Sequence, residues 1–366
     1  MLKRLLIGIV VFAALLAVIA SYGRAAAQQS GAQGGRGAAG PARIAPDPTT
    51  QDPKRLVTDA QMRKWEQEFK NWGRWGKDDQ KGAINLITPA KTKAALQLVK
   101  EGTSVSLHRF PDLKKEIDDM QFGETIHRMA SIDPVTNKPR SAVDYVAFGT
   151  HDGTSAHMDA LCHYGVQSEA SLGDQQHLYN GFLNKLTLQG CTDLGSDKNA
   201  PGAITRGILV DLPLMKKVDW LEPKTAIYVE DLEAWEKFAN IKIGPGDAVF
   251  IRTGRYARRD KLGPWNAAAE CAGLHASVIP WLKQRDIAIL GAETVPDVQP
   301  SGVQGWPRPI HDILLPIMGT QLVDNGYFED AAKEAARLKR WEFMLSYSVL
   351  RIPGGTATPF TALATF

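Results

Sequence analysis

The sequence predicts a single domain of mixed α and β structure. Short apolar runs, rich in Val, Ile and Leu, recur along the chain at intervals that suit β-strands. Segments with helical spacing of apolar residues separate several of these runs, and this alternation indicates an α/β fold. The loops between them are too long and irregular for a regular barrel. The roughly 310 residues that follow the N-terminal segments fit one domain, although they exceed the commonest domain size.

The first 27 residues have the pattern of a signal peptide. Lys3 and Arg4 give a basic start, an apolar run covers residues 5–20, and Ala25 to Ala27 supply the small residues that a signal peptidase requires. The apolar run is slightly shorter than the about 20 residues of a membrane-spanning helix. We therefore expect cleavage after Ala27 and export to a periplasm or out of the cell. An uncleaved membrane anchor is the alternative.

Residues 28–55 are rich in Gly, Ala, Pro and Gln and predict a disordered linker, so that the folded domain covers residues 56–366. Cleavage removes three of the 43 Lys and Arg residues and leaves 40, equal to the 40 Asp and Glu residues. A formally neutral mature protein argues against nucleic acid or an anionic membrane as partner, because both require a basic surface. We expect a small-molecule substrate instead.

The folded domain is expected to begin with two helices and a strand. Apolar residues recur at i, i+3 and i+7 within residues 58–72 and predict the first helix. The second helix is predicted over residues 88–100, because Thr88 can cap it and Pro89 occupies the first helical position. Residues 104–108 then alternate between apolar and polar like a strand.

Residues 110–144 show no strong periodicity and contain clusters of Pro, Asp and Gly. We expect an irregular excursion there, which could fold over the functional site as a flap. Strands and helices alternate beyond it. The expected strands are residues 207–212, 226–230, 247–252, 287–291 and 343–350, and the expected helices are residues 230–238, 275–285 and 328–341.

The three cysteines, Cys162, Cys191 and Cys271, are too few and too odd in number for a disulfide scaffold. They allow one disulfide in an oxidising compartment. For Cys162 we expect a free thiol that behaves as a small buried apolar group.

Residues His151 to His163 carry the strongest chemical signal in the sequence. They read His-Asp-Gly-Thr-Ser-Ala-His-Met-Asp-Ala-Leu-Cys-His and contain three of the eight histidines of the chain and two aspartates. Imidazole nitrogen and carboxylate oxygen are typical ligands of zinc or manganese rather than calcium. In an extended strand, side chains two positions apart share a face, so His157 and Asp159 can bind one ion. Ordinary polar residues on a loop are the alternative.

The two outer histidines need further conditions. His151 can reach the same ion only if the chain turns within Gly153-Thr-Ser, since six extended residues span roughly 20 Å. His163 could serve as another ligand or as a free base beside the metal.

A catalytic metal needs about three protein ligands and an open position for water, so further ligands are expected downstream. His311 lies at the start of an apolar segment, and Asp324 follows thirteen residues later. Glu293 follows the strand expected over residues 287–291, at the strand end where acids commonly line a site. For His311, a structural hydrogen bond to a backbone carbonyl is the alternative.

Several stretches together resemble the cyclase family of metal-dependent hydrolases, which includes bacterial kynurenine formamidases and isatin hydrolases. The family motif is His-x-Gly-Thr-His-x-Asp-x-Pro-x-His, and its second half matches His157-Met-Asp-Ala-Leu-Cys-His163. The resemblance covers roughly residues 60 to 366 and implies the swivelling β/β/α-like fold of that family. The other matching stretches are Trp72-Gly-Arg-Trp-Gly, Asn85-Leu-Ile-Thr-Pro, Tyr179-Asn-Gly-Phe, Arg206-Gly-Ile-Leu-Val-Asp, Arg252-Thr-Gly, Gly263-Pro-Trp, Ala272-Gly-Leu-His, Trp281-Leu, His311-Asp-Ile-Leu-Leu and Gly354-Gly-Thr-Ala-Thr-Pro.

The resemblance implies a site of one or two divalent ions, zinc or manganese. His157, Asp159 and His311 would be ligands, and Asp159 could bridge two ions. Asp324 falls where the family often has a ligating glutamate, which is one methylene longer. His163 would be the general acid and base.

The chain departs from the family motif at its first histidine. That position is Gly153 here, which offers no ligand atom in its side chain. His151 lies two residues earlier and could replace the missing ligand if the loop has a different course.

The implied activity is hydrolysis of carbon–nitrogen bonds other than peptide bonds, in small amides, formamides or lactams, as in arylformamidases and isatin hydrolases. Trp72 and Trp75 could form a stacking wall for an aromatic substrate, and His127 could contact it. Core packing for the tryptophans and a surface position for His127 are the alternatives. Other candidate functions are a metal-dependent cyclase, lactonase or dehydratase, and an exported binding protein without catalysis. The family also implies a homo-oligomer, a dimer or a tetramer.

Overall fold

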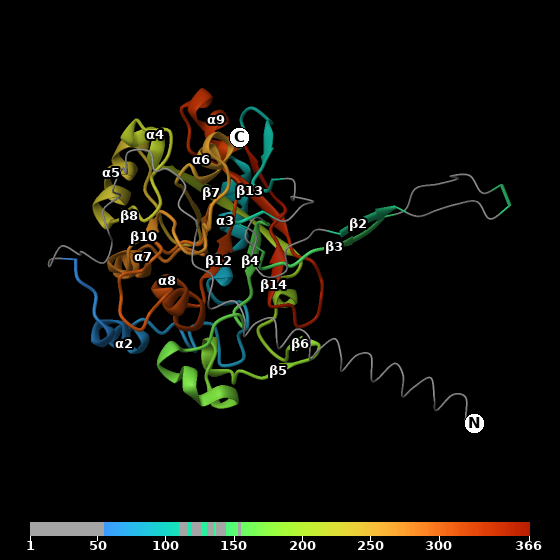
Figure 1. The fold of residues 1–366 in the computed structure, drawn as a ribbon, viewed down its shortest axis with the longest axis vertical. Helices are drawn as coiled ribbons and strands as arrows, with labels where there is room; N and C mark the ends of the chain where they lie inside the picture. Colours follow the sequence, from blue (N-terminus) through green and yellow to red (C-terminus); the bar gives the residue numbers. More distant parts are fainter. Residues whose placement is uncertain (1–54, 110–115, 119–125, 130–134, 137–143, 153–154) are drawn as a thin grey trace, which may run out of the picture. The chain divides into compact units, whose positions relative to one another are not determined.

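Nine strands form one mixed sheet at the centre of the fold (Figure 1). The computed structural model describes residues 55–109, 116–118, 126–129, 135–136, 144–152 and 155–366. The predicted signal peptide and almost all of the predicted linker lie outside these residues. The strands lie side by side in the order β1 (Ser104–Ser106), β15 (Ala362–Thr365), β13 (Glu342–Ser348), β7 (Gly202–Asp211), β9 (Ala248–Arg252), β11 (Ile289–Ala292), β12 (Gln321–Asp324), β4 (His157–Asp159) and β14 (Ala357–Pro359).

The four central strands β7, β9, β11 and β12 are parallel, and the strands on both sides of them are antiparallel. Parallel strands are covered on both faces, so their sequences are continuous apolar runs. The run Ala248–Arg252 of β9 is buried at every position. Such runs are the signals that predicted most of the strands.

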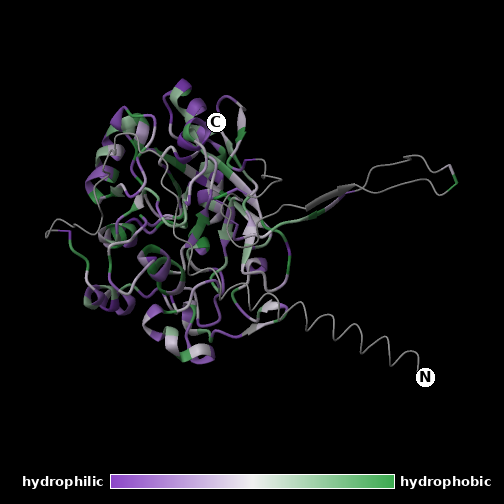
Figure 2. Ribbon diagram, in the orientation of Figure 1, coloured by the Kyte–Doolittle hydropathy of each residue, from purple (hydrophilic) through white to green (hydrophobic). Residues whose placement is uncertain are grey.

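Two hydrophobic clusters cover the two faces of the sheet, because successive side chains of a strand point to opposite faces. On β7, Ile208 and Val210 belong to the first cluster, and Leu209 belongs to the second. Figure 2 shows hydrophobic residues along the central strands and a mixture of hydrophobic and hydrophilic residues along the outer helices.

Helices complete the two layers around the sheet. The first cluster receives apolar side chains from α2 (Asp59–Glu68), α5 (Val229–Ala239), α7 (Ile279–Arg285) and α8 (Pro309–Ile313). The second cluster receives alanines from α9 (Glu329–Leu338). The remaining α-helices of the described residues are α3 (Pro89–Leu96), α4 (Leu212–Lys216) and α6 (Arg255–Leu262). None of the helices in these residues is long and apolar enough to cross a membrane.

The mixed α/β architecture expected from the sequence is confirmed, with differences at the element ends. Helix α2 stops at Glu68 rather than near residue 72, because Phe69 leaves the helical conformation and its amide closes the last turn on Trp65. Helix α3 stops at Leu96. The strand expected over residues 226–230 is only β8 (Ala226–Ile227), and it pairs with β10 (Gly273–Leu274) outside the main sheet.

The excursion over residues 110–144 contains regular structure that the sequence did not predict. β2 (Ile126–Met129) pairs antiparallel with β3 (Asp144–Ala147). Most of the remaining residues of this range lie outside the described part of the chain. The predicted flap over the functional site falls on these residues and stays a prediction. Asp118 is an exception, because it is described and buried.

The expectation of a free thiol at Cys162 is wrong. Cys162 forms a disulfide with Cys191, and Cys271 is the buried free cysteine. Cys191 lies on β6 (Gly190–Cys191), which pairs with β5 (Leu186–Thr187). The disulfide joins residues 29 positions apart and ties this hairpin to the segment that follows β4. A pairing between positions so distant in sequence depends on the fold, which three cysteines alone do not reveal.

Candidate metal centre

Two neighbouring strands carry part of a dense group of His and Asp side chains. β4 pairs antiparallel with β12, and the register places His157 opposite Asp324 and Met158 opposite Val323. Side chains alternate along β4, so His157 and Asp159 leave one face while Met158 packs into the second cluster. The extended conformation that was expected for this pair is confirmed.

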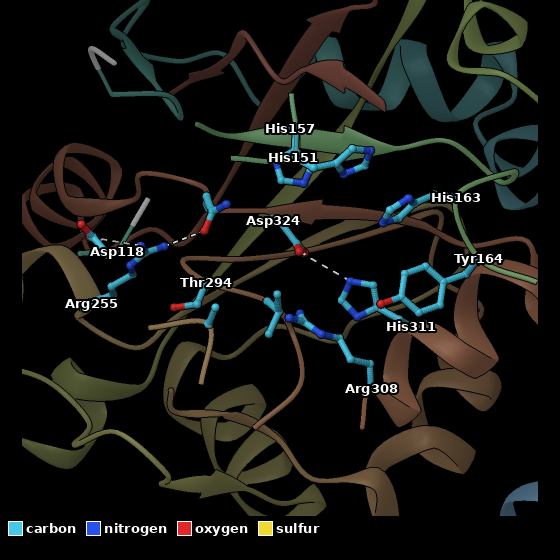
Figure 3. A pocket seen from close by; sticks show the side chains of 13 residues that line it. Asp118, His151, His157, His163, Tyr164, Arg255, Thr294, Arg308, His311 and Asp324 are labelled. Atoms are coloured by element: carbon cyan, nitrogen blue, oxygen red, sulfur yellow. Dashed lines mark hydrogen bonds and ion pairs between the residues drawn. The ribbon is translucent and has the colours of Figure 1, made fainter. Parts of the chain in front are cut away.

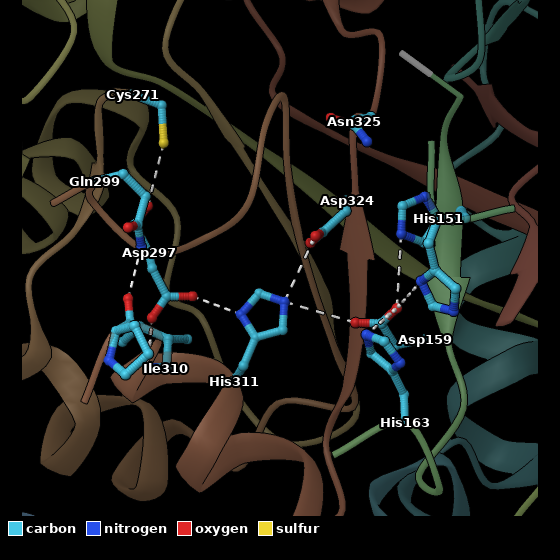
Figure 4. Close-up of polar contacts among 12 residues, drawn as sticks. His151, Asp159, His163, Cys271, Asp297, Gln299, Ile310, His311, Asp324 and Asn325 are labelled. Atoms are coloured by element: carbon cyan, nitrogen blue, oxygen red, sulfur yellow. Dashed lines mark hydrogen bonds and ion pairs between the residues drawn. The ribbon is translucent and has the colours of Figure 1, made fainter. Parts of the chain in front are cut away.

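Three imidazoles surround one oxygen of the Asp159 carboxylate. His151 precedes β4 and His163 follows it, and both rings lie close to Asp159 (Figure 4). The distances to Asp159 Oδ1 are 3.6 Å from His151 Nδ1, 3.7 Å from His157 Nε2 and 4.0 Å from His163 Nε2. His151 therefore reaches the group. The turn expected within Gly153-Thr-Ser falls largely on residues 153 and 154, which lie outside the described residues.

The other Asp159 oxygen faces a histidine from the far end of the sequence. His311 lies on α8, and its Nε2 is 3.6 Å from Asp159 Oδ2 and 3.5 Å from Asp324 Oδ2. Helix α8 lies between β11 and β12 in the sequence, and it returns His311 to the β12 end that carries Asp324 (Figure 4). All five sequence-predicted metal ligands are thus brought together.

These residues form two groups of three that share Asp159. Within each group, the ligand atoms lie within 4.8 Å of one another, the first being His151, His157 and Asp159 and the second Asp159, His311 and Asp324. Two ligand atoms that are each about 2.1 Å from a tetrahedral ion lie roughly 3.4 Å apart. The observed separations of 3.5 to 3.7 Å are close to that value and too long for good hydrogen bonds.

The hydrogen-bonding state of the carboxylates shows that the residues fit a cation. Asp159 is 1 % exposed, and neither of its oxygens has a hydrogen-bond partner among the described residues. Asp324 Oδ1 is also buried without such a partner. A buried, unpaired carboxylate is costly, and coordination to a divalent ion removes that cost. The donor set of imidazole and carboxylate is the one that zinc and manganese accept.

Three of the four histidines around Asp159 are held in the neutral form that binds metals, namely His151, His157 and His163. Burial lowers the pKa of His157, and burial together with the neighbouring His157 lowers the pKa of His151 to about 4. Burial, with the nearby histidines, lowers the pKa of His163 to about 2. The His157 Nδ1 lies 2.9 Å from the Ser155 carbonyl oxygen, so this nitrogen carries the proton and Nε2 is left to face Asp159.

A residue that the sequence did not single out orients His311. Asp297 Oδ2 lies 2.5 Å from His311 Nδ1, and Asp297 Oδ1 accepts a hydrogen bond from the amide of Ile310 (Figure 4). Burial lowers the pKa of His311, but the carboxylates of Asp324 and Asp297 outweigh burial and raise it to about 10. A carboxylate behind a histidine fixes the ring and directs the other nitrogen to the metal.

The acid that the sequence did suggest, Glu293, lies elsewhere. Its Oε2 accepts hydrogen bonds from the amides of Thr253, Gly254 and Arg255, so it holds the start of α6. Burial raises its pKa to about 7. The acid that contacts the candidate ligand His311 is Asp297, four residues further along the same segment.

A cavity of about 210 Å³ opens beside the His and Asp group (Figure 3). It is smaller than the about 300–1,000 Å³ of sites for drug-sized ligands, so it suits a small molecule. His163 reaches it with 29 % of its side chain exposed, and its ring stacks on His151 with centroids 4.0 Å apart. The lining residues are Asp118, His151, His157, His163, Tyr164, Arg255, Ala268, Thr294, Val295, Arg308, His311, Asp324 and Asn325.

Trp72 and Trp75, two of the predicted substrate contacts, are not among the described residues that line this cavity. Trp72 packs against the first hydrophobic cluster and donates a hydrogen bond from Nε1 to the Pro316 carbonyl at 2.8 Å. Trp75 lies under the guanidinium of Arg74, 4.6 Å from the ring centroid. Packing, the alternative for the tryptophans, is what the structure shows for Trp72, whereas Trp75 is half-buried beside Arg74 and belongs to neither cluster. His127 lies on β2, and its side chain is outside the described part of the structure.

The fold and the shared Asp159 define a cyclase-type domain with a candidate His/Asp metal centre. The family described as "Putative cyclase" matches residues 103–296, more than half of the chain. The chain therefore belongs to this cyclase family, as its motifs suggested. No curated protein sequence matches the chain.

Solved structures have the same fold. The crystal structure of "a novel cyclase" is 28% identical over 82% of this chain and 99% of its own length, with a TM-score of 0.70. An isatin hydrolase bound to the product analogue thioisatinate is 19% identical over 75% of this chain and 94% of its own, with a TM-score of 0.50. Isatin hydrolase A from Labrenzia aggregata is 20% identical over 72% of this chain and 93% of its own, with a TM-score of 0.50. The expected cyclase fold is thus confirmed.

Proposed function

We propose that this protein is a metal-dependent hydrolase that cleaves carbon–nitrogen bonds other than peptide bonds in small amides, formamides or lactams. The observation that carries the proposal is the buried Asp159 carboxylate, which has no hydrogen-bond partner among the described residues and faces four imidazoles. Such a group stabilises a fold poorly but holds a divalent ion well. The adjoining small cavity supplies room for a substrate.

The proposed ligands are His151, His157, Asp159, His311 and Asp324, and zinc or manganese fits them. When bound, such an ion acidifies a coordinated water molecule and polarises a carbonyl group. Asp159, shared between the two groups of three, allows two ions. Its position is fixed by β4, and His311 is fixed by Asp297.

His163 is the proposed general acid and base. Its ring is partly exposed to the cavity, and its Nε2 is 4.0 Å from Asp159, further than the nitrogens of His151 and His157. The His151 ring stacks against it and restricts its rotation. As general base and acid, His163 would take a proton from the attacking water and deliver it to the leaving nitrogen, a contribution worth about 10²–10⁴-fold. Without a bound ion or substrate, burial lowers its pKa to about 2, so this role requires a higher pKa in the complex with substrate.

The alternative function, an exported binding protein that has lost catalysis, has less support from the structure than from the sequence. Its only support was the glycine at position 153, where the family motif has a histidine. His151 lies in the group with its Nδ1 3.6 Å from Asp159, so the number of nitrogen ligands is maintained.

The test combines elemental analysis of the purified protein with assays of formanilide, N-formylkynurenine and isatin after loading with Zn²⁺ or Mn²⁺. We expect one or two ions per chain and turnover of at least one substrate. His163→Ala should retain the metal and lose about 10²–10⁴-fold in kcat. His177→Ala is the matched control, because His177 pairs with Glu169 outside the cavity. A protein that binds neither metal contradicts the proposal.

We also propose export after cleavage behind Ala27, since a disulfide is typical of oxidising compartments. N-terminal sequencing of the mature protein tests it, and a start at Met1 would refute cleavage. Light scattering on the same preparation tests the expected dimer or tetramer.

A further inference from the structure

Arg308 is a cation in the wall of the cavity whose role the proposed reaction does not explain. It is the residue before α8, three positions ahead of His311. Its side chain lines the cavity and extends past His311 towards Thr294 (Figure 3). The residue is only partly exposed, so its charge is not freely solvated.

The guanidinium of Arg308 has no hydrogen-bond or ion-pair partner within the part of the chain that the structure describes. Burial lowers the pKa of Arg308, but Tyr164 and the carboxylates of Asp324 and Asp297, acting through space, outweigh burial and raise it. Both carboxylates make their closest contact with the His311 ring instead, at 3.5 and 2.5 Å. A guanidinium offers five donors in a planar arrangement, and leaving them unpaired in a half-buried place costs free energy.

Arg255, the second arginine of the cavity wall, differs from Arg308 because protein groups bind its guanidinium. Arg255 donates to the Glu293 carbonyl at 2.7 Å and to Asn325 Oδ1 at 2.6 Å, and it lies 3.4 Å from Asp118. Arg255 is therefore held by the protein, whereas Arg308 is left for a ligand.

We propose that Arg308 binds a carboxylate of the substrate, so that the preferred substrates are small amides, formamides or lactams that carry a carboxylate near the scissile bond. This inference rests on the proposed function. A carboxylate matches the guanidinium with two parallel hydrogen bonds, which gives orientation as well as affinity. The carboxylate anchors the substrate at Arg308 while the carbonyl group lies towards the His and Asp group, on the other side of the same small cavity.

The kinetic test compares formanilide with 2-, 3- and 4-formamidobenzoate, which share the scissile bond and differ by one carboxylate. For the metal-loaded wild type, we expect at least one formamidobenzoate to exceed formanilide in kcat/KM. Arg308→Met should lower kcat/KM for that substrate by about 10–100-fold, mainly through KM, and for formanilide by less than about 3-fold. Arg308→Lys should restore part of the loss. Arg63→Met, an exposed change on α2, is the matched control.

Equal losses for the neutral and anionic substrates would overturn the inference, because they would indicate a general electrostatic role. An absence of any effect of Arg308→Met would also overturn it. If any of these compounds is hydrolysed, this kinetic comparison decides whether Arg308 binds a substrate carboxylate.

Where none is hydrolysed, binding to the metal-free protein decides. Calorimetric titration with benzoate and benzamide measures the contribution of the charge without catalysis. Benzoate binding that is at least about 10-fold weaker in Arg308→Met, with benzamide unchanged, would support the anion site although the proposed reaction had failed. Benzoate that binds the wild type no better than benzamide, or that binds the variant equally well, would overturn the inference.

Discussion

Replacement of Asp159 by Asn tests the metal centre most directly, because it removes a charge and almost no volume. Asp159 is 1 % exposed, and its two oxygens have no hydrogen-bond partner among the described residues. Burial, together with the nearby Asp324 carboxylate, raises the pKa of Asp159 well above 3.8, although His311 acts in the opposite direction. Without metal, this carboxyl group therefore destabilises the fold at neutral pH. The Asp159→Asn variant should be more stable than the wild type under those conditions.

The size of this gain has an upper bound, because a carboxyl group that is too costly to ionise takes a proton instead. Keeping that proton at pH 7 costs about 1.36 kcal/mol for each pH unit above the ordinary pKa of 3.8, or about 4 kcal/mol. The asparagine amide remains unpaired and returns about 1–3 kcal/mol of the gain. We therefore expect the free energy of unfolding to rise by roughly 1–3 kcal/mol.

The dependence on pH has a definite sign. A raised pKa means that the folded protein binds more protons than the unfolded chain at pH values between 3.8 and the raised pKa of Asp159. The wild type therefore loses stability as the pH rises through this range. The advantage of the asparagine variant should shrink as the pH falls towards 3.8, because the protonated aspartic acid is then as neutral as asparagine.

Metal should reverse the order of stability. At a metal concentration of 1,000 Kd, the wild type gains about 4.1 kcal/mol, which exceeds the expected advantage of the variant. The variant lacks the carboxylate that both groups of three share, so it should gain little. Urea denaturation in chelator and in Zn²⁺ or Mn²⁺ measures both effects, and Asp330→Asn, an exposed change on α9, is the control. A variant that is less stable than the wild type in chelator, or equally stabilised by metal, would refute the reasoning.

Two further predictions concern residues outside the ligand set. Asp297→Asn should weaken metal binding by about 10–100-fold, because the His311 ring loses the carboxylate that orients it. Competition with a chelator measures the affinity, and an unchanged affinity would contradict this prediction. Replacement of both Cys162 and Cys191 by Ser should cost about 3–4 kcal/mol in urea unfolding, as expected for a loop of 29 residues. Reductant should destabilise the wild type equally, and the same effect in Cys271→Ser would argue against the disulfide as the cause.

The sequence could predict the short-range part of the site. His157 and Asp159 share a strand face through their spacing alone, and the periodicity of β4 needs no partner strand. The contribution of His151 could not be decided in this way. Whether His151 or a residue at position 153 faces Asp159 depends on the course of the loop between them, and a loop has no periodicity from which to predict it.

The roles of two residues near His311 could not be predicted from the sequence, for a different reason. Asp297 and Arg308 act through long-range neighbours, and each is ordinary in its local sequence. Asp297 is significant because His311 lies against it, and Arg308 because nothing described pairs with it. Glu293 had the better sequence signal, yet the amides at the start of α6 occupy its carboxylate. The contacts that each charged side chain makes, and not its residue type, therefore distinguish a structural residue such as Glu293 from the proposed functional residues Asp297 and Arg308.

The strand order explains how such distant residues meet. Because β9, β11 and β12 are parallel, their carboxyl ends lie at one edge of the sheet, where ligands of open α/β sheets commonly bind. Arg255, Thr294 and Asn325 follow these three strands, and all three line the cavity. β4 runs antiparallel to β12 and so begins at the same edge, opposite Asp324. The register of β4 and β12 thus fixes one histidine and both carboxylates of the proposed metal centre, whereas His151 comes from the segment before β4.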